Sequence, residues 1–290
     1  MPTYCTVDDV KLQMQASQVA SMAATEAVKL LALCRSVTAQ VDRLFQVRRP
    51  FFFPYIESRQ RPVTPHTVNT MQNSLFFTDN LLELTSVTAG TTALTIGSTV
   101  EAWPTVDTPY HYLRLMSYWN NWYQYLQDDS TPLFVSINGV WGFHRDYANA
   151  WLKVDDLAGD INASVTSLTV ADVDGADDYG RTPRISAGNL LKIGAEYLEV
   201  TATNTGTNAV TVRRGVNGST AAAHTTGDDV NVWQVEDTIR AETARQVGYV
   251  YARRGAYETA TINDIGVQQF PPTMVASLLG AVEGYSYGLP

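Results

Sequence analysis

The sequence predicts an α+β fold, in which a helical core carries a β-hairpin region and an inserted all-β domain. Apolar residues recur at helical spacing near both ends of the chain, over 22–47 and 236–254. Short alternating runs separated by turn residues fill 158–233, which is typical of a small sandwich or barrel. We therefore expect 1–157 together with 234–290 to form the helical core, and 158–233 to form the inserted β domain.

The helices expected for the core have recognisable start and stop signals. Thr6 can cap a short helix whose first turn carries Asp8 and Asp9, where acidic residues favour the helix dipole. The helix over 22–47 should end before Pro50, because the residue preceding a proline is disfavoured in α conformation. A last helix is expected at 272–283. We expect the terminal helices to pack together.

Between these helices the pattern predicts short strands and two turns. Ala89-Gly90 indicates a hairpin turn. Asn138-Gly139 is a strong two-residue turn signal, because both positions can take positive φ. Together with the aromatics that follow it, this turn is interpreted as the junction where the β domain departs. Strands are expected at 74–78, 81–87, 92–96 and 110–115.

The predicted β domain has its own strands and turns. Gly194-Ala195 is a plausible tight hairpin, and Asn217-Gly218 is a further turn. Strands are expected at 165–170, 190–193, 197–201, 209–213 and 230–232.

Large apolar side chains supply the candidates for contacts with other subunits. Two aromatic runs stand out, at 51–55 and 118–125. The run at 51–55 is first interpreted as a loop packed under the fold and second as a contact with another subunit. The run at 118–125 fits one helical stripe or a strand. The candidate interface residues are Phe51, Phe52, Phe53, Trp119, Trp122, Trp141, Trp151, Phe270, Met274 and Leu278.

Composition limits the function classes. The 290 residues carry a net charge of −9, which argues against a protein that holds nucleic acid by neutralising its phosphates. Cys5 and Cys34 are expected to be buried free thiols. No signal peptide or membrane-spanning run is apparent, so synthesis in the cytosol without membrane contact is expected.

The sequence offers little chemistry. The four histidines lack metal-ligand spacing, and no nucleophile or phosphate-binding motif is present, so no catalytic residue and no cofactor are predicted. Asp172, Asp174 and Asp177 surround Gly175 and could hold Ca²⁺ with their carboxylates. The spacing does not fit the EF-hand pattern, which favours a solvated acidic turn.

Three stretches together resemble the head–tail connector (adaptor) proteins of long-tailed bacteriophages. They are Tyr4-Cys-Thr-Val-Asp-Asp-Val-Lys11, Ser74-Leu-Phe-Phe-Thr-Asp-Asn-Leu-Leu-Glu-Leu84 and Ile137-Asn-Gly-Val-Trp-Gly-Phe-His144. The resemblance covers roughly 1–155 and 234–290. The block at 158–233 departs from it and resembles a small β module of phage virion proteins through Leu191–Val200 and Arg214–His224.

The resemblance implies a structural protein of the virion neck, with a helical connector core. Copies would form a ring, typically twelvefold, between the portal protein and a tail-side neck or stopper protein. The ring would extend the channel through which double-stranded DNA passes without sequence-specific contact, and assembly would take place in the host cytoplasm. Residues 256–290 would reach the portal.

Two other functions stay open. The chain could be a virion decoration protein, or a tail or baseplate component, whose β module binds glycans through the aromatics of 118–151. A third hypothesis is a polysaccharide-active enzyme that uses the acids of Asp172–Asp178.

Overall fold

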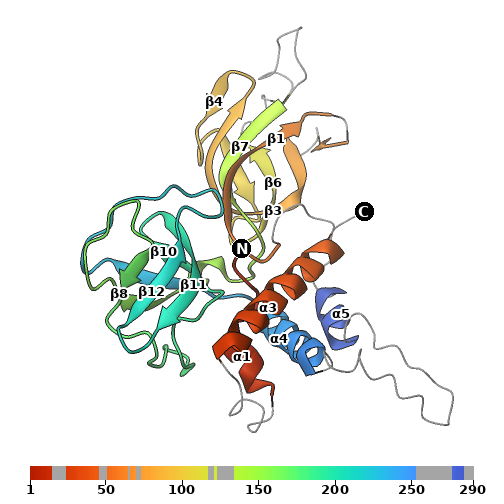
Figure 1. The fold of residues 1–290 in the computed structure, drawn as a ribbon. Coiled ribbons are helices and arrows are strands. Elements are labelled where there is room, and N and C mark those ends of the chain that lie inside the picture. The colour runs from red at the N-terminus through yellow and green to blue at the C-terminus, as the bar shows by residue number, and fades with distance from the viewer. Residues whose placement is uncertain are drawn as a thin grey trace, which may run out of the picture. The chain divides into compact units, whose positions relative to one another are not determined.

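The fold is seen in a computed structural model and divides into two compact units (Figure 1). The mixed unit comprises Met1–Pro50, Trp151–Val216 and Thr220–Tyr287, and the sheet unit comprises Phe51–Ala150 with Asn217–Ser219. The structure describes residues 1–14, 24–45, 51–64, 66–69, 73–116, 121–122, 134–252 and 276–283.

The structure is mostly β, and the predicted α+β fold with a helical core is wrong. Thirteen strands and four α-helices occur among the described residues. A seven-stranded antiparallel sheet occupies Tyr55–Trp141, where the sequence had suggested a hairpin region attached to helices. The expected domain boundaries at 158 and 233 stay a prediction. The division into compact units groups the chain differently, because it places the terminal helices in one unit with the β module.

The helices of the mixed unit begin and end close to the sequence signals. Thr6 caps the first helix through a capping box, in which its hydroxyl accepts from the Asp9 N–H and the Asp9 carboxylate accepts from the Thr6 N–H. As predicted, the terminal helices pack together, and α4 contacts α1, α3 and α5. The helices are α1 (Val7–Leu12), α3 (Ala24–Leu44), α4 (Asp237–Ala252) and α5 (Ala276–Glu283).

The second part of the mixed unit is a six-stranded antiparallel sheet in the order β8-β13-β10-β11-β12-β9. A bridge between Leu157 and Val170 joins its two outer strands, so the sheet curls almost into a barrel around a core of valine, leucine and isoleucine. The predicted turn at Gly194-Ala195 is confirmed. The strands are β8 (Trp151–Asp156), β9 (Ser167–Thr169), β10 (Leu190–Ile193), β11 (Glu196–Asn204), β12 (Ala209–Arg213) and β13 (Asp229–Trp233).

Charged contacts tie the helices of the mixed unit to its sheet. The buried carboxylate of Glu199 on β11 pairs with Arg35 of α3 at 3.0 Å and with Arg213 of β12. Ser186 donates to Asp8 of α1 at 2.7 Å. Cys5 and Cys34 are buried free thiols, as expected, with their Sγ atoms 3.8 Å apart.

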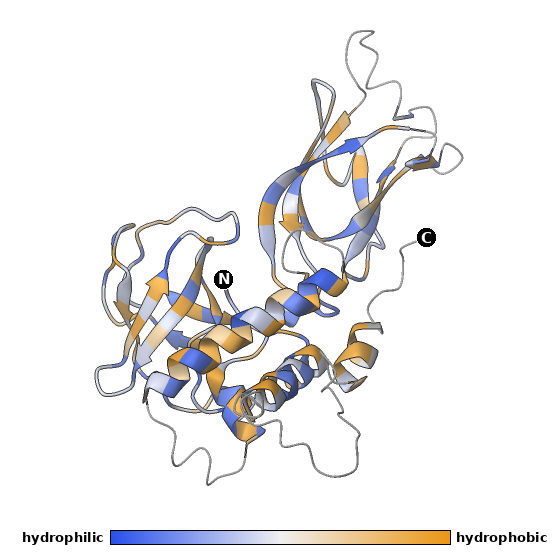
Figure 2. Cartoon of the chain, turned by 45° about the vertical axis from the view of Figure 1, so that its right-hand side comes forward, coloured by the Kyte–Doolittle hydropathy of each residue, from blue (hydrophilic) through white to orange (hydrophobic). Residues whose placement is uncertain are grey.

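The sheet unit is built on one curved sheet with the strand order β1-β7-β3-β6-β5, and β2 and β4 also pair with β3. Figure 2 shows hydrophobic and hydrophilic residues alternating along its strands, as expected where one face of a sheet covers a core. The elements are β1 (Tyr55–Pro62), β2 (Val68–Asn69), β3 (Ser74–Ala89), β4 (Thr92–Leu94), β5 (Val100–Trp103), β6 (Tyr110–Leu115), β7 (Phe134–Trp141) and the 3₁₀ turn η2 (Tyr147–Asn149).

The predicted turn at Asn138-Gly139 is wrong, because both residues lie within the central strand β7. Gly139 pairs with Glu57 on one side and with Leu84 on the other. A Cβ atom at this position would lie 2.2 Å from the carbonyl oxygen of Glu83. The glycine therefore permits a close backbone approach at a bulge of β3, which is the other common use of glycine in a strand.

Two further predicted turns are present in the sheet unit, and one of them, Asn217-Gly218, had been expected in the β domain. Gly90 has φ +59° and follows β3 directly, so the hairpin to β4 is confirmed. Asn217 and Gly218 both have positive φ, at +53° and +82°. The Asn217 carbonyl accepts from the Ile56 N–H at 2.9 Å and its side chain donates to the Pro54 carbonyl at 3.0 Å, which explains why this turn belongs to the sheet unit.

Candidate functional site

A row of aromatic side chains, one exposed and two partly exposed, crosses three neighbouring strands of the sheet unit. Phe76 of β3 is paired with Tyr112 of β6, and Tyr112 is paired with Trp103 of β5. The Phe76 and Tyr112 ring centroids are 4.9 Å apart, and the Tyr112 and Trp103 rings are nearly parallel at 6.2 Å. We call Phe76, Tyr112 and Trp103 the aromatic row.

Two charged side chains accompany the aromatic row. The guanidinium of Arg114 lies over the Trp103 ring, 5.4 Å from its centroid. The Trp103 indole N–H donates to Glu101 at 2.6 Å. Glu101 and Arg114 are register partners on β5 and β6. Within the part of the chain that the structure describes, Arg114 makes no ion pair.

Strand alternation explains why this row lies on the surface. Leu113 and Leu115 of β6 are buried in the core, so Tyr112 and Arg114, which alternate with them, lie on the opposite face. Phe76 likewise alternates with buried Leu75 and is 40% exposed. This row is not evident in the sequence, because pairing across three strands brings its members together from distant positions.

A second cluster lies on the other face of the same sheet, beside Trp141. The guanidinium carbons of Arg59 and Arg61 lie 4.4 and 5.7 Å from the Trp141 ring centroid. Asp79 pairs with Arg59 at 2.8 Å and also with Arg61. Burial lowers the pKa of both arginines to about 10, and the charge of Arg59 also lowers that of Arg61.

This cluster has an evident structural use. β1 is an edge strand of the sheet, and inward-pointing charges on an edge strand discourage pairing with further strands. The arginines also cover Trp141, whose indole N–H donates to the Glu57 carbonyl at 3.2 Å. Both arginines stay charged at neutral pH, so the cluster offers no proton for acid–base chemistry.

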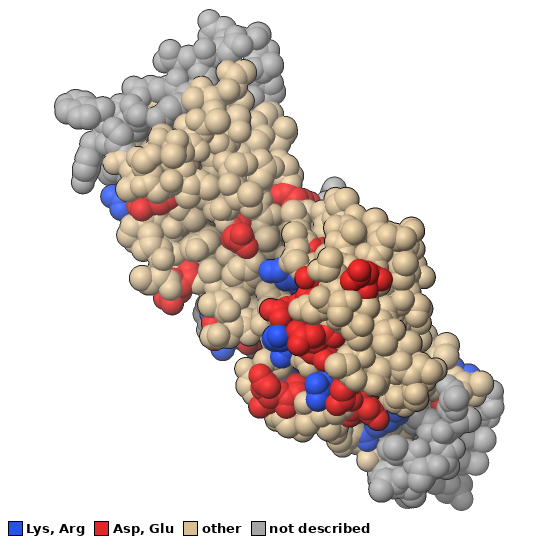
Figure 3. All heavy atoms as spheres, turned by 90° about the vertical axis from the view of Figure 1, so that its left-hand side faces the viewer, with Lys and Arg blue, Asp and Glu red and all other residues tan. Residues whose placement is uncertain are grey.

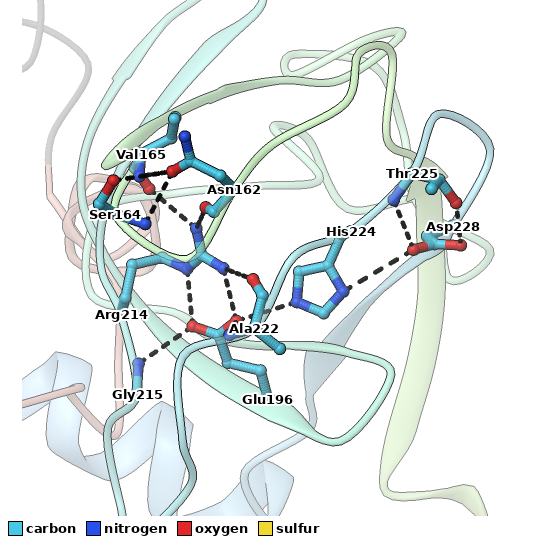
Figure 4. Close-up of polar contacts among 10 residues, drawn as sticks. All are labelled: Asn162, Ser164, Val165, Glu196, Arg214, Gly215, Ala222, His224, Thr225 and Asp228. Carbon is cyan, nitrogen blue, oxygen red and sulfur yellow. Dashed lines mark hydrogen bonds and ion pairs between the residues drawn. The ribbon is translucent and has the colours of Figure 1, made fainter.

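The mixed unit contains a buried ionic network around Glu196 (Figure 4). Arg214 binds both carboxylate oxygens of Glu196 at 2.6 Å. His224 contacts the same carboxylate at 2.9 Å and lies 3.7 Å from Asp228. Arg214 also donates to the carbonyls of Asn162 and Val165, both at 2.9 Å. The network therefore fixes the loop after β12 against the segment before β9.

The Glu196 network is fully occupied by its own contacts. Burial raises the pKa of Glu196. The hydrogen bonds from Arg214, from the Ala222 N–H and from His224 lower this pKa by more than burial raises it, to about 2. The side chain of Glu196 is 0% exposed. A carboxylate that is ionised at neutral pH, shielded from solvent and bound by several donors suits a structural role rather than general-base catalysis.

Most predicted interface residues that the structure describes are buried. Phe52, Phe53, Trp122, Trp141 and Leu278 lie in the core, and the Trp122 indole N–H donates to the Asn73 carbonyl at 2.9 Å. Phe51 is partly exposed and stacks on Phe143 at 5.4 Å. Trp151 is partly exposed and contacts the rings of Tyr197 and Trp233. Trp119, Phe270 and Met274 lie outside the described residues.

In the acidic turn considered for Ca²⁺, the carboxylates of Asp172 and Asp177 are engaged within the chain, whereas Asp174 is exposed. Asp172 accepts from the Gly175 N–H at 3.0 Å and pairs with Arg184 at 3.1 Å. Asp177 pairs with Arg181 at 2.7 Å. Among the described residues, no three His, Cys, Asp or Glu side chains are grouped in a way that could hold a metal ion.

Comparisons with other proteins found no match, so the function is inferred from the geometry. No protein-family model matches the chain, and no curated protein matches it either. None of the described helices is long and apolar enough to cross a membrane. Of the three clusters described above, the aromatic row with Arg114 is the strongest candidate for a functional surface, because the other two have an evident structural use.

Proposed function

We propose that this protein is a structural virion protein that forms a ring between the portal and the tail of a long-tailed bacteriophage. The ring extends the DNA channel and provides the platform to which a tail-side neck or stopper protein attaches. The protein has no catalytic role and needs no cofactor. It belongs to the neck of the virion and assembles in the host cytoplasm.

The observation that carries this proposal is the exposed aromatic row with Arg114. Aromatic residues and arginine are enriched in protein interfaces, and Trp, Tyr and Arg supply most of the residues that dominate binding energy. A closed ring requires each copy to present two different surfaces, one for each neighbour. The aromatic row is suited to be one of these surfaces.

The charge of the chain supports the passage of DNA. The net charge of −9 repels the DNA backbone when it is multiplied around a ring. On the face drawn in Figure 3, acidic side chains of the mixed unit gather beside lysine and arginine. Lys153, for example, pairs with Asp156 at 2.8 Å and with Asp229 at 2.6 Å. Such mixed charge offers DNA no continuous basic track.

The proposal is tested by mixing the purified chain with the portal protein of the same virus. We expect electron microscopy to show added ring density on the portal, and native mass spectrometry to count several copies of the chain per portal. A chain that stays monomeric, fails to bind the portal and binds a glycan would contradict the proposal.

The alternative function is glycan binding by a virion decoration protein or a tail or baseplate component. Exposed aromatic rings favour it, because they combine an apolar face with polar atoms. In the aromatic row, however, Tyr112 and Arg114 already lie against the Trp103 ring. That arrangement leaves less ring surface for a sugar and favours a protein partner. Titration with glycans, followed by tryptophan fluorescence, tests this alternative directly.

A further inference from the structure

We propose that the aromatic row is the surface on which a second copy of this chain docks, head to tail. This inference rests on the proposed ring and names the contact that builds it. The docking surface comprises Phe76, Tyr112, Trp103 and Arg114. Its occupant is a different surface of the neighbouring copy, since a ring needs heterologous contacts.

Phe76 is exposed beside buried neighbours. Phe76 is 40% exposed, whereas Phe77, the next residue in the same strand, is 8% exposed and packs in the core. Tyr112 and Trp103 continue from Phe76 across β6 and β5. Three adjacent rings on the outer face of a sheet leave apolar surface in water, and a partner that covers them gains the hydrophobic free energy.

The docking surface also carries charge. Arg114 lies over Trp103, and its register partner Glu101 accepts from the Trp103 indole N–H, but Arg114 makes no ion pair with any described residue. A carboxylate of a partner can therefore still bind it. A second copy suits this role because each copy carries a net charge of −9. An arginine that is held by an aromatic ring is preorganised to bind a carboxylate, because its planar group is already placed. A neutral glycan would leave this cation without a partner.

The test is photo-crosslinking from within the row. A photoreactive benzoylphenylalanine replaces Phe76 in the purified chain, which is irradiated alone and bound to portal. A mixture of ¹⁵N-labelled and unlabelled chains distinguishes crosslinks between copies from those within one copy. We expect mixed-label dimers, with the crosslink joining residue 76 to one surface peptide of the other copy. The control places the same group at Val106, which is 84% exposed in the same unit, and it should give few dimers.

Substitutions then measure the contribution of the row. Arg114→Glu and Trp103→Ala should each weaken association by about tenfold or more in sedimentation velocity, whereas Val106→Ser should leave it unchanged. Thermal unfolding establishes that each variant is folded. Crosslinks within one copy, or no mixed-label dimer in either condition, would overturn the inference. Equal association of all variants would do the same.

The outcomes separate this inference from the ring itself. If the chain forms rings on the portal and the row variants form them equally well, the inference fails and the ring stands. If mixed-label dimers form through residue 76 but the chain neither binds the portal nor closes into a ring, the docking surface stands and the ring proposal fails. Binding of a glycan at the row, with no dimer, would overturn both.

Discussion

The two sheets of this protein differ in which groups they bury and which they leave on the surface. In the mixed unit, Glu196 and Arg214 are buried and satisfy each other together with nearby backbone groups. In the sheet unit, aromatic rings lie on the outer face, and Arg114 beside them has no described ion-pair partner. Buried charges that are paired serve the fold, whereas exposed aromatic rings beside an unpaired cation are suited to a partner.

The comparison also separates two uses of arginine in the sheet unit. Arg59 and Arg61 cover Trp141 on the inner side of the sheet and share Asp79 as their counter-ion. Arg114 covers Trp103 on the outer side and makes no ion pair with a described residue, although Glu101 is its register partner on β5. Stacking on tryptophan occurs in both places, so it does not by itself indicate function. What distinguishes the outer site is the exposed surface of Phe76 and an arginine that makes no ion pair with a described residue.

Glu196→Gln in the buried network of the mixed unit should have the largest effect on stability. The variant leaves Arg214 buried without its counter-ion, which costs about 3 kcal/mol or more of unfolding free energy. Urea unfolding measures the loss, and hydrogen exchange of β10 and β11 places it in the mixed unit. Glu101→Gln in the sheet unit is the control and should cost under about 1 kcal/mol, because Glu101 is partly exposed. A loss below about 1 kcal/mol for Glu196→Gln would show that the network contributes little.

Gly139→Ala should follow, with a loss of about 2 kcal/mol or more in the sheet unit. The added Cβ would lie 2.2 Å from the Glu83 carbonyl oxygen and 2.8 Å from a Leu81 methyl group, so β3 and β7 must separate. Urea unfolding again gives the loss. Gly159→Ala is the matched control, since a Cβ there meets nothing within 4 Å. Equal effects of the two substitutions would contradict the close strand approach.

Acid should affect the mixed unit through Glu196. The folded-state pKa is lowered to about 2 from an ordinary value of 4.5. The stabilisation is thus complete above about pH 4.5 and decreases as pH falls toward 2, because the unfolded chain takes up the proton first. In the upper part of this pH range, we expect a smaller loss of unfolding free energy than Glu196→Gln causes. Unfolding at several pH values measures the slope, and Glu196→Gln should remove this contribution to it. An unchanged slope would place the acid sensitivity elsewhere.

Phe76→Ser on the outer face of the sheet unit should have the smallest effect on stability. Phe76 is 40% exposed and loses mainly its ring contact with Tyr112, which is worth under about 1 kcal/mol. The neighbouring substitution Phe77→Ser removes a buried side chain and should cost about 3 kcal/mol or more. The same urea experiment compares the two. A similar loss for both would assign Phe76 to the fold rather than to a partner.

Local signals in the sequence predicted local structure well. Thr6 and Asp9 indicated the start of α1, because capping involves residues three positions apart. The strands at 190–193 and 110–115 were predicted at their observed bounds. Hairpins at Ala89-Gly90 and Gly194-Ala195 were predicted because a positive φ at glycine is itself a local property.

The same local reasoning was wrong where a distant strand changes the meaning of a residue. Asn138-Gly139 has the composition of a turn, but β1 and β3 pair with it on both sides and keep it extended. The strand β1 was not predicted, and its Arg59 and Arg61 face inward toward Trp141. With strands β1 and β7 included, the expected hairpin region becomes a seven-stranded sheet.

By itself, therefore, the sequence determined the helices at both ends, most of the individual strands and the turns that depend on a single glycine. The tertiary structure decided how many strands share a sheet, which face of each strand is covered and which aromatics stay exposed. Buried Trp141 and exposed Phe76 are indistinguishable as apolar residues in the sequence. Their difference arises only when strands from distant positions pair, because burial is a property of the assembled sheet and not of the residue.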